Sequence, residues 1–134
     1  MMLKGSLWRC ARLALALLLG LLGTIAAAES AQPQKLNPYT GNPDAIKEGR
    51  TLFLQVGCSG CHGVGGGGGM GPALLDDDWT FGSDDETLVK LIKGEIPQQT
   101  MPSVFGKELS DDDVWKILAY VRSLYRGDPS KINW

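Results

Sequence analysis

The chain has 134 residues, with 13 basic and 15 acidic side chains and a net charge of −2 at neutral pH. That balance argues against nucleic-acid binding, because phosphate recognition needs a basic patch. The length allows one folded domain of ordinary size.

The first 28 residues are typical of a secretory signal peptide. Three basic residues within positions 1–12 precede an apolar run that ends at Ala26-Ala27-Ala28, a small-residue cleavage pattern. An uncleaved membrane anchor is the alternative, although the run is short for a span of about 20 residues. Cleavage after Ala28 would remove Cys10 and leave 10 basic against 15 acidic residues, a net charge of −5. We therefore expect a periplasmic protein without stable membrane insertion, whose acidity could steer it toward a basic patch on a partner.

The next segment, residues 29–42, is polar and contains prolines, which predicts an extended lead-in. Asn42 as N-cap and Pro43 at the first helical position then predict the start of a first helix. Gly57 is its expected stop. The residues that share one face of this helix are Ile46, Gly49, Phe53 and Val56.

A second helix is predicted from Ser83, which forms a capping box pattern with Glu86, to a stop at Gly94. Two further segments show no helical or strand periodicity. The run Asp76–Asp78 is expected to be solvated surface. The segment 95–109 contains two prolines and is expected to be a loop.

A third helix is predicted from the N-cap Ser110 to a stop at Gly127. Trp115 lies off its apolar stripe and is expected to be partly exposed. Three helices with such long connections bury a small core, and loops of this length are unusual unless they enclose something. A large apolar cofactor would account for both features. The apolar stripe of the third helix consists of Val114, Ile117, Leu118, Val121, Leu124 and Tyr125.

The sequence Cys58-Ser59-Gly60-Cys61-His62 is C-x-x-C-H, the attachment signature of c-type haem. The two thiols add to the two vinyl groups of the porphyrin, and the adjacent imidazole reaches the iron. A zinc site would need a fourth ligand, and no further Cys or His follows the signal peptide. A thioredoxin-like pair would need a βαβ context, and a plain disulfide would leave His62 unexplained. The motif predicts one haem c, covalently bound through Cys58 and Cys61, with His62 on the iron.

The second axial ligand cannot be histidine, because the chain contains only one. Methionine paired with histidine is the usual arrangement for electron transfer, since the thioether raises the reduction potential. Met70 follows His62 on the same loop and is expected to serve loop packing. Met101, stiffened by Pro102, could approach from the other face and is the expected iron ligand.

In this order the features resemble the class I cytochromes c over residues 44–125. The resemblance implies an all-α, cytochrome c-like fold of three main helices with long loops around one haem. It further implies that the Pro72 carbonyl accepts a hydrogen bond from His62, and that Trp79 donates to a haem propionate, with core packing as the alternative. The matching residues are Gly49, Phe53, Cys58, Cys61, His62, Gly71, Pro72, Met101, Pro102, Ile117 and Tyr120, of which Ile117 and Tyr120 would pack across Gly49 and Phe53.

The resemblance implies a cytochrome domain at residues 43–127, followed by a tail at 128–134. Its function would be that of a monomeric periplasmic electron carrier rather than an enzyme. The loops and last helix look like small cytochromes that accept electrons from PQQ-dependent alcohol dehydrogenases; a terminal oxidase or a reductase would be the acceptor. Two alternatives are a haem enzyme or ligand sensor with a labile sixth ligand, and a haem subunit of a larger dehydrogenase complex.

Five consecutive glycines, Gly65–Gly69, separate His62 from Pro72. A phosphate-binding loop is a weak interpretation, because neither a P-loop lysine nor a preceding strand is present. Glycines allow positive φ angles and close approach of the backbone to the ring or to a partner. The hypothesis is that this bare backbone leaves the haem edge accessible.

Overall fold

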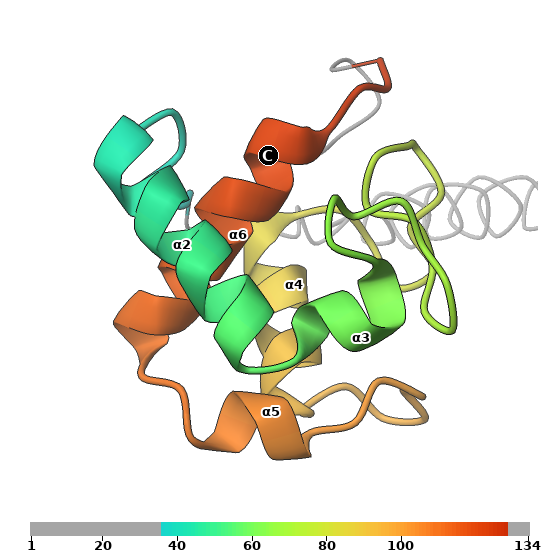
Figure 1. The fold of residues 1–134 in the computed structure, drawn as a ribbon. Coiled ribbons are helices and arrows are strands. Elements are labelled where there is room, and N and C mark those ends of the chain that lie inside the picture. Colours follow the sequence, from blue (N-terminus) through green and yellow to red (C-terminus); the bar gives the residue numbers. More distant parts are fainter. Residues whose placement is uncertain (1–35, 129–134) are drawn as a thin grey trace, which may run out of the picture. The chain divides into compact units, whose positions relative to one another are not determined.

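A computed structural model describes residues 36–128. The predicted signal peptide, the first half of the lead-in and most of the tail lie outside the described residues. Within the described part the chain forms helices and no strand, as the all-α prediction requires (Figure 1). Its helices are also all too short or too polar to cross a membrane. The helices are α2 (Pro43–Gln55), α3 (Cys58–His62), α4 (Asp85–Lys93), α5 (Val104–Lys107) and α6 (Asp111–Leu124).

Helix α2 begins where the sequence predicts. The side chain of Asn42 accepts hydrogen bonds from the backbone nitrogens of Asp44 at 3.0 Å and Ala45 at 3.1 Å, and Pro43 occupies the first turn. The helix ends at Gln55, two residues before the predicted stop. Gly57, with φ +92°, turns the chain directly into α3.

Helices α2 and α6 cross at backbone contact, as predicted. A Cβ atom on Gly49 would lie 1.9 Å from the carbonyl oxygen of Lys116, so no side chain fits between the two helices. One turn further on, the rings of Phe53 and Tyr120 meet edge to face, with centroids 5.3 Å apart. The crossing therefore brings the end of α2, which leads into the C-x-x-C-H motif, against the middle of α6.

Helix α6 supplies most of the buried core. Its cap is confirmed: Ser110 Oγ accepts from the Asp113 backbone nitrogen at 3.1 Å, and the Asp113 carboxylate accepts in return. The helix ends at Leu124, before the predicted Gly127, because Tyr125 adopts extended backbone. The expectation that Trp115 is partly exposed is wrong, because it is only 7% exposed. The lead-in crosses it, and Asn37 donates to the Trp115 carbonyl at 2.8 Å.

The predicted start of α4 is wrong by one residue. Asp84, not Ser83, is the N-cap, and its carboxylate accepts from the Thr87 backbone nitrogen at 2.8 Å. Glu86 forms no capping box and instead pairs with Lys90 on the surface at 2.8 Å. The stop at Gly94, with φ +77°, is confirmed.

The shift at the start of α4 has a buried cause. Asp85 and Arg122 form an ion pair at 2.7 Å, with each side chain only 2% exposed. The Asn37 backbone nitrogen donates to the same carboxylate at 3.0 Å, and the Ser83 carbonyl accepts from Arg122. Because burying a charge without compensation is costly, this pair and its hydrogen bonds fix which residue begins the helix.

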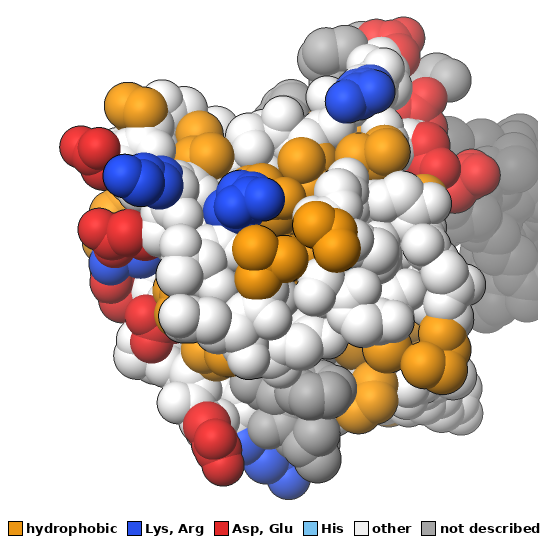
Figure 2. Space-filling model, in the orientation of Figure 1, with side chains coloured by type: hydrophobic (Ala, Val, Ile, Leu, Met, Phe, Trp, Pro, Cys, Tyr) orange, Lys and Arg blue, Asp and Glu red, His pale blue; other side chains and the backbone are white. Residues whose placement is uncertain are grey.

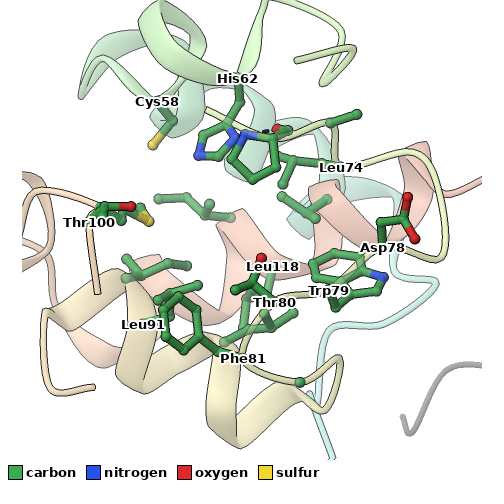
Figure 3. Close-up of a pocket in the computed structure, with 18 of the residues that line it drawn as sticks. Cys58, His62, Leu74, Asp78, Trp79, Thr80, Phe81, Leu91, Thr100 and Leu118 are labelled. Atoms are coloured by element: carbon green, nitrogen blue, oxygen red, sulfur yellow. Dashed lines mark hydrogen bonds between the residues drawn. The ribbon is translucent and has the colours of Figure 1, made fainter. Parts of the chain in front are cut away.

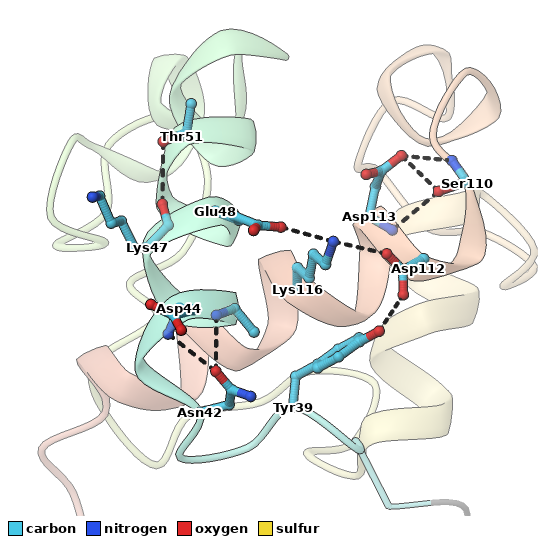
Figure 4. A network of polar contacts seen from close by, with 11 residues as sticks. Tyr39, Asn42, Asp44, Lys47, Glu48, Thr51, Ser110, Asp112, Asp113 and Lys116 are labelled. Carbon is cyan, nitrogen blue, oxygen red and sulfur yellow. Dashed lines mark hydrogen bonds and ion pairs between the residues drawn. The ribbon is translucent and has the colours of Figure 1, made fainter.

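A surface network joins the lead-in to both crossing helices (Figure 4). Lys116 pairs with Glu48 at 2.7 Å and with Asp112 at 2.9 Å, and the Tyr39 hydroxyl donates to Asp112. The hydrogen bonds to the two carboxylates raise the pKa of Lys116 above its ordinary value. The two carboxylates are more than half exposed, although Lys116 is only 21% exposed, so the network adds orientation more than stability.

The segment 95–109 is not entirely a loop as predicted, because it contains the short helix α5. A Cβ atom on Gly106 would lie 1.9 Å from the Ile92 carbonyl oxygen, so α5 packs its backbone directly on α4. Helix α5 follows Met101 in the chain, so this contact anchors one end of the segment that carries the predicted ligand.

Replacing Gly49 with alanine should destabilise the fold strongly. The added methyl would overlap the Lys116 carbonyl and force the two helices apart, at a cost of about 3 kcal/mol or more. The measurement is the free energy of unfolding in urea. Gly65→Ala is the control, since its Cβ would meet nothing within 4 Å. Equal stability of the two variants would contradict the crossing described here.

Candidate haem site

A cavity of about 390 Å³ lies between α3, α4, α6 and the loops that connect them (Figure 3). A smaller cavity of about 310 Å³ shares five of its lining residues: Cys58, His62, Pro72, Thr100 and Met101. The wall of the larger cavity is mostly apolar, which suits a porphyrin and excludes water. Its main apolar residues are Phe53, Leu88, Ile92, Ile117, Leu118 and Val121.

Helix α3 presents the C-x-x-C-H motif in little more than one turn. Cys58 is buried and Cys61 half-buried, and both are free thiols rather than a disulfide. Figure 3 shows the Cys58 sulfur and the His62 ring directed toward the cavity from this helix. Burial raises the pKa of the Cys58 thiol, so the uncombined side chain is held protonated. The two cysteines and the histidine thus fit one edge and one face of a haem.

The predicted hydrogen bond from His62 to Pro72 is present. The Nδ1 atom of His62 lies 2.8 Å from the Pro72 carbonyl oxygen. A ring whose Nδ1–H donates to this carbonyl leaves the lone pair of Nε2 for a metal. Gly71 makes the approach possible, because a Cβ there would lie 2.9 Å from Cε1 of the His62 ring.

The two candidate methionines are in different surroundings. Met101 is partly buried, packs against the hydrophobic core and lines both cavities. Figure 3 shows its neighbour Thr100 entering from a segment separate from α3. Met70 is 86% exposed and lines only the smaller cavity, so the expectation that it packs within its loop is wrong.

Trp79 lines the cavity, but its indole N–H is engaged elsewhere. It donates to the Asp76 carbonyl at 3.0 Å, and its ring lies 5.7 Å from the guanidinium carbon of Arg122. A hydrogen bond to a propionate would require this donor to change partner, so that role stays a prediction. The buried Arg122 beneath Trp79 was not anticipated from the sequence, although its spacing from Leu118 on the apolar stripe of α6 was a usable signal.

The expectation that Asp76–Asp78 is solvated surface holds for Asp76 and Asp78, which are exposed, but not for Asp77. The carboxylate of Asp77 accepts from the Tyr125 hydroxyl and from the Asp128 backbone nitrogen, the latter at 3.2 Å. The Arg126 nitrogen also donates to the Leu75 carbonyl at 2.8 Å. These bonds tie the loop after Pro72 to the chain beyond α6 and so close one wall of the cavity.

The five glycines are not equivalent. Gly66 and Gly68 have φ angles of +74° and +89°, and a Cβ on Gly66 would lie 2.9 Å from Leu124. The Gly68 nitrogen donates to the His62 carbonyl at 2.9 Å, which folds the loop back onto α3. Added Cβ atoms on Gly65 and Gly67 would meet nothing within 4 Å. Backbone geometry therefore requires glycine at two of these positions and leaves others free.

Both thiols, the oriented imidazole and Met101 line the smaller cavity, and all of them except Cys61 also line the larger apolar one. In an all-helical domain this arrangement defines a class I c-type cytochrome. The sequence profile of the family described as cytochrome c oxidase, cbb3-type, subunit III matches residues 44–121, more than half of the chain. The chain therefore belongs to this family of cytochrome c domains. As a member of this family it carries covalently bound haem c.

Individual relatives agree with this assignment. Cytochrome c-L of Methylorubrum extorquens is 32% identical over 100 residues, covering 73% of this chain and 49% of the relative. FixP, a cbb3-type cytochrome c oxidase subunit of Sinorhizobium medicae, is 33% identical over 121 residues, covering 75% and 41%. The chain thus spans half or less of the length of these two relatives.

Solved structures give the same picture. The crystal structure of cytochrome cL from Methylophaga aminisulfidivorans superposes with a TM-score of 0.64 at 38% identity, covering 72% of this chain and 66% of that one. Cytochrome cL from Hyphomicrobium denitrificans also gives 0.64, at 31% identity, covering 72% and 57%. The cytochrome c fold predicted from the sequence is confirmed.

Replacing Gly66 with alanine should lower stability by about 1–3 kcal/mol, because the backbone is left-handed there and the added methyl would overlap Leu124. Gly67→Ala, one residue along the same loop, should stay within about 0.5 kcal/mol of the wild type. Urea unfolding of the haem-loaded protein measures both. A destabilised Gly67→Ala would show that the loop is tighter than described.

Proposed function

We propose that the chain is a periplasmic one-electron carrier rather than an enzyme, with Cys58 and Cys61 in thioether bonds to the haem and His62 and Met101 on its iron. The observation that supports this most strongly is that Cys58, His62 and Met101 line the same apolar cavity. Bound haem supplies a redox centre that gains or loses one electron.

The chain's own residues would keep that centre nearly unchanged between oxidation states. Pro72 holds the His62 ring, and the segment before α5 holds Met101. The apolar walls exclude water, which together with a thioether ligand favours the reduced iron and raises the potential. With both ligands fixed, little rearrangement accompanies electron transfer.

The proposed donor is a PQQ-dependent alcohol dehydrogenase, and the proposed acceptor is a terminal oxidase. The sequence resemblance to cytochromes that serve such dehydrogenases supports the donor, together with the similarity to cytochrome c-L. The similarity to FixP, named as an oxidase subunit, supports the acceptor. The signal-like first 28 residues support the periplasm.

The proposed docking surface surrounds the smaller cavity. No Asp, Glu, Lys or Arg stands between Arg50 and Asp76, or between Glu95 and Lys107, and these two segments supply all of its lining residues. Figure 2 shows backbone and hydrophobic side chains over α3 and the glycine loop, with acidic side chains toward the edges of the view. We expect a partner to meet this uncharged surface through apolar contacts and glycine backbone, so local ion pairs would contribute little.

Replacing Met101 with alanine should open the sixth position. The reduced protein should then bind carbon monoxide rapidly, and the reduction potential should fall by about 0.1 V, within the range of about 0.8 V that axial ligands span. Met70→Ala is the matched control and should change neither property. If Met70→Ala had the larger effect, the ligand assignment would be wrong.

Electron transfer from the donor should be fast and depend weakly on salt. Stopped-flow mixing with a PQQ-dependent alcohol dehydrogenase from the same cell measures haem reduction at low and high ionic strength. Because the docking surface is uncharged, the rate should change by no more than about threefold. A steep fall with salt would show that the acidic edges steer docking instead. Slow reduction at every salt concentration would count against this donor.

A second candidate function is a haem subunit of a larger respiratory or dehydrogenase complex, and the FixP similarity favours it. The distinguishing observation is the state of the protein isolated from its own membranes and periplasm. Stoichiometric copurification with a catalytic subunit would support the subunit role, whereas a free monomer would support the carrier.

A further inference from the structure

We propose that Gln99 is a positioning residue, whose side-chain amide holds the segment of Met101 in the place required for iron ligation. The proposal rests on the proposed function, in which Met101 is the sixth ligand. The relevant residues are Ile96–Met101, which connect the end of α4 to the ligand.

The segment opens with a tight turn. The Gln99 nitrogen donates to the Ile96 carbonyl at 3.3 Å, with Pro97 and Gln98 between them. Gln98 has φ +65° and is the one described residue other than glycine with a positive φ. Proline followed by a residue of positive φ is the pattern of a type II turn. Glutamine lacks the conformational freedom of glycine there, so the turn needs support from its surroundings.

Gln99 supplies that support with all of its amide atoms. Its Oε1 accepts from the Ile96 nitrogen at 3.0 Å. Its Nε2 donates to two carbonyl oxygens, those of Leu91 and Met101, each at 2.9 Å. The side chain is partly buried, so water competes poorly for these groups. One amide thus joins the last turn of α4, the turn itself and the backbone of the ligand.

The hydrogen bond from Gln99 to Leu91 ties the Met101 segment to a rigid part of the cavity wall. Leu91 lies on α4 and itself lines the cavity, so the carbonyl that accepts from Gln99 belongs to a packed helix. On the far side of Met101, a Cβ on Gly94 would lie 2.1 Å from Cβ of Ser103, so that end of the segment is also held close to α4. Among the described residues, Gln99 is the side chain that hydrogen-bonds to Met101. Loss of this bond would leave the Met101 segment held only at its Ser103 end.

The test is displacement of Met101 by imidazole in the oxidised, haem-loaded protein. Gln99→Leu removes all three hydrogen bonds at similar size. Gln99→Glu keeps an acceptor for Ile96 but loses both donors while ionised. Gln55→Leu, at an exposed glutamine on α2, is the matched control. Methionine is avoided at position 99, because a new thioether could itself bind iron.

Both Gln99 variants should bind imidazole about tenfold more tightly than wild type, equivalent to about 1.4 kcal/mol, while Gln55→Leu should not differ. The charge-transfer absorption of thioether-ligated ferric haem should be lost at correspondingly lower imidazole concentration. Imidazole affinities of both variants within twofold of wild type would overturn the proposal, even if their unfolding stability fell. If Gln99→Leu does not fold, Gln99→Glu decides alone, because it preserves the shape of the side chain.

Met101→Ala separates this proposal from the one on which it rests. If Met101→Ala keeps the thioether absorption and the wild-type imidazole affinity, Met101 is not the ligand, and the ligand assignment fails. If Met101→Ala loses that absorption while the Gln99 variants behave like wild type, the ligand assignment stands and only the positioning role of Gln99 is rejected. The supporting result places the Gln99 variants between wild type and Met101→Ala.

Discussion

The structure depends on the backbone contact between α2 and α6 at Gly49. Because no side chain separates the two helices there, their distance and crossing are fixed by main-chain atoms and tolerate no alternative packing. Helix α2 leads into the C-x-x-C-H motif, and α6 provides Ile117, Leu118 and Val121 to the cavity wall. The site for covalent attachment and the wall that encloses the ring are therefore positioned by one contact.

A second fixed point is the buried pair of Asp85 and Arg122. The pair contributes little to the net free energy of folding, because the cost of desolvating two charges offsets most of their attraction. Its effect is to set where α4 begins, to receive the backbone of Asn37 and to place a guanidinium under the Trp79 ring. The buried pair thereby fixes the positions of the lead-in, of α4 and of one edge of the cavity relative to one another.

The sequence was sufficient for features that local chemistry determines. The resemblance to the class I cytochromes c supplied the His62 to Pro72 hydrogen bond and the close approach at Gly49, and both are present. The local sequence by itself supplied the N-cap Asn42 and the capped start of α6. It failed where a distant partner decides. Asp84 replaces Ser83 as the cap beside the buried pair of Asp85 and Arg122. Trp115 is buried where Asn37 of the lead-in bonds to its carbonyl, and Asp77 is engaged by Tyr125. Such partners lie tens of residues away and leave no local signal.

The placement of the two methionines separates the attachment of the haem from the binding of the second ligand to its iron. The thiols and imidazole lie within five consecutive residues, so attaching the ring needs almost no tertiary structure. Met70 is eight residues from His62 and exposed, whereas Met101 lines the cavity from the segment between α4 and α5. Loop-closure entropy favours the nearer sulfur in an unfolded chain. If Met101 is the ligand, as proposed, the exposed Met70 would compete with it for the iron during refolding, and exchange between the two sulfurs would delay the last step.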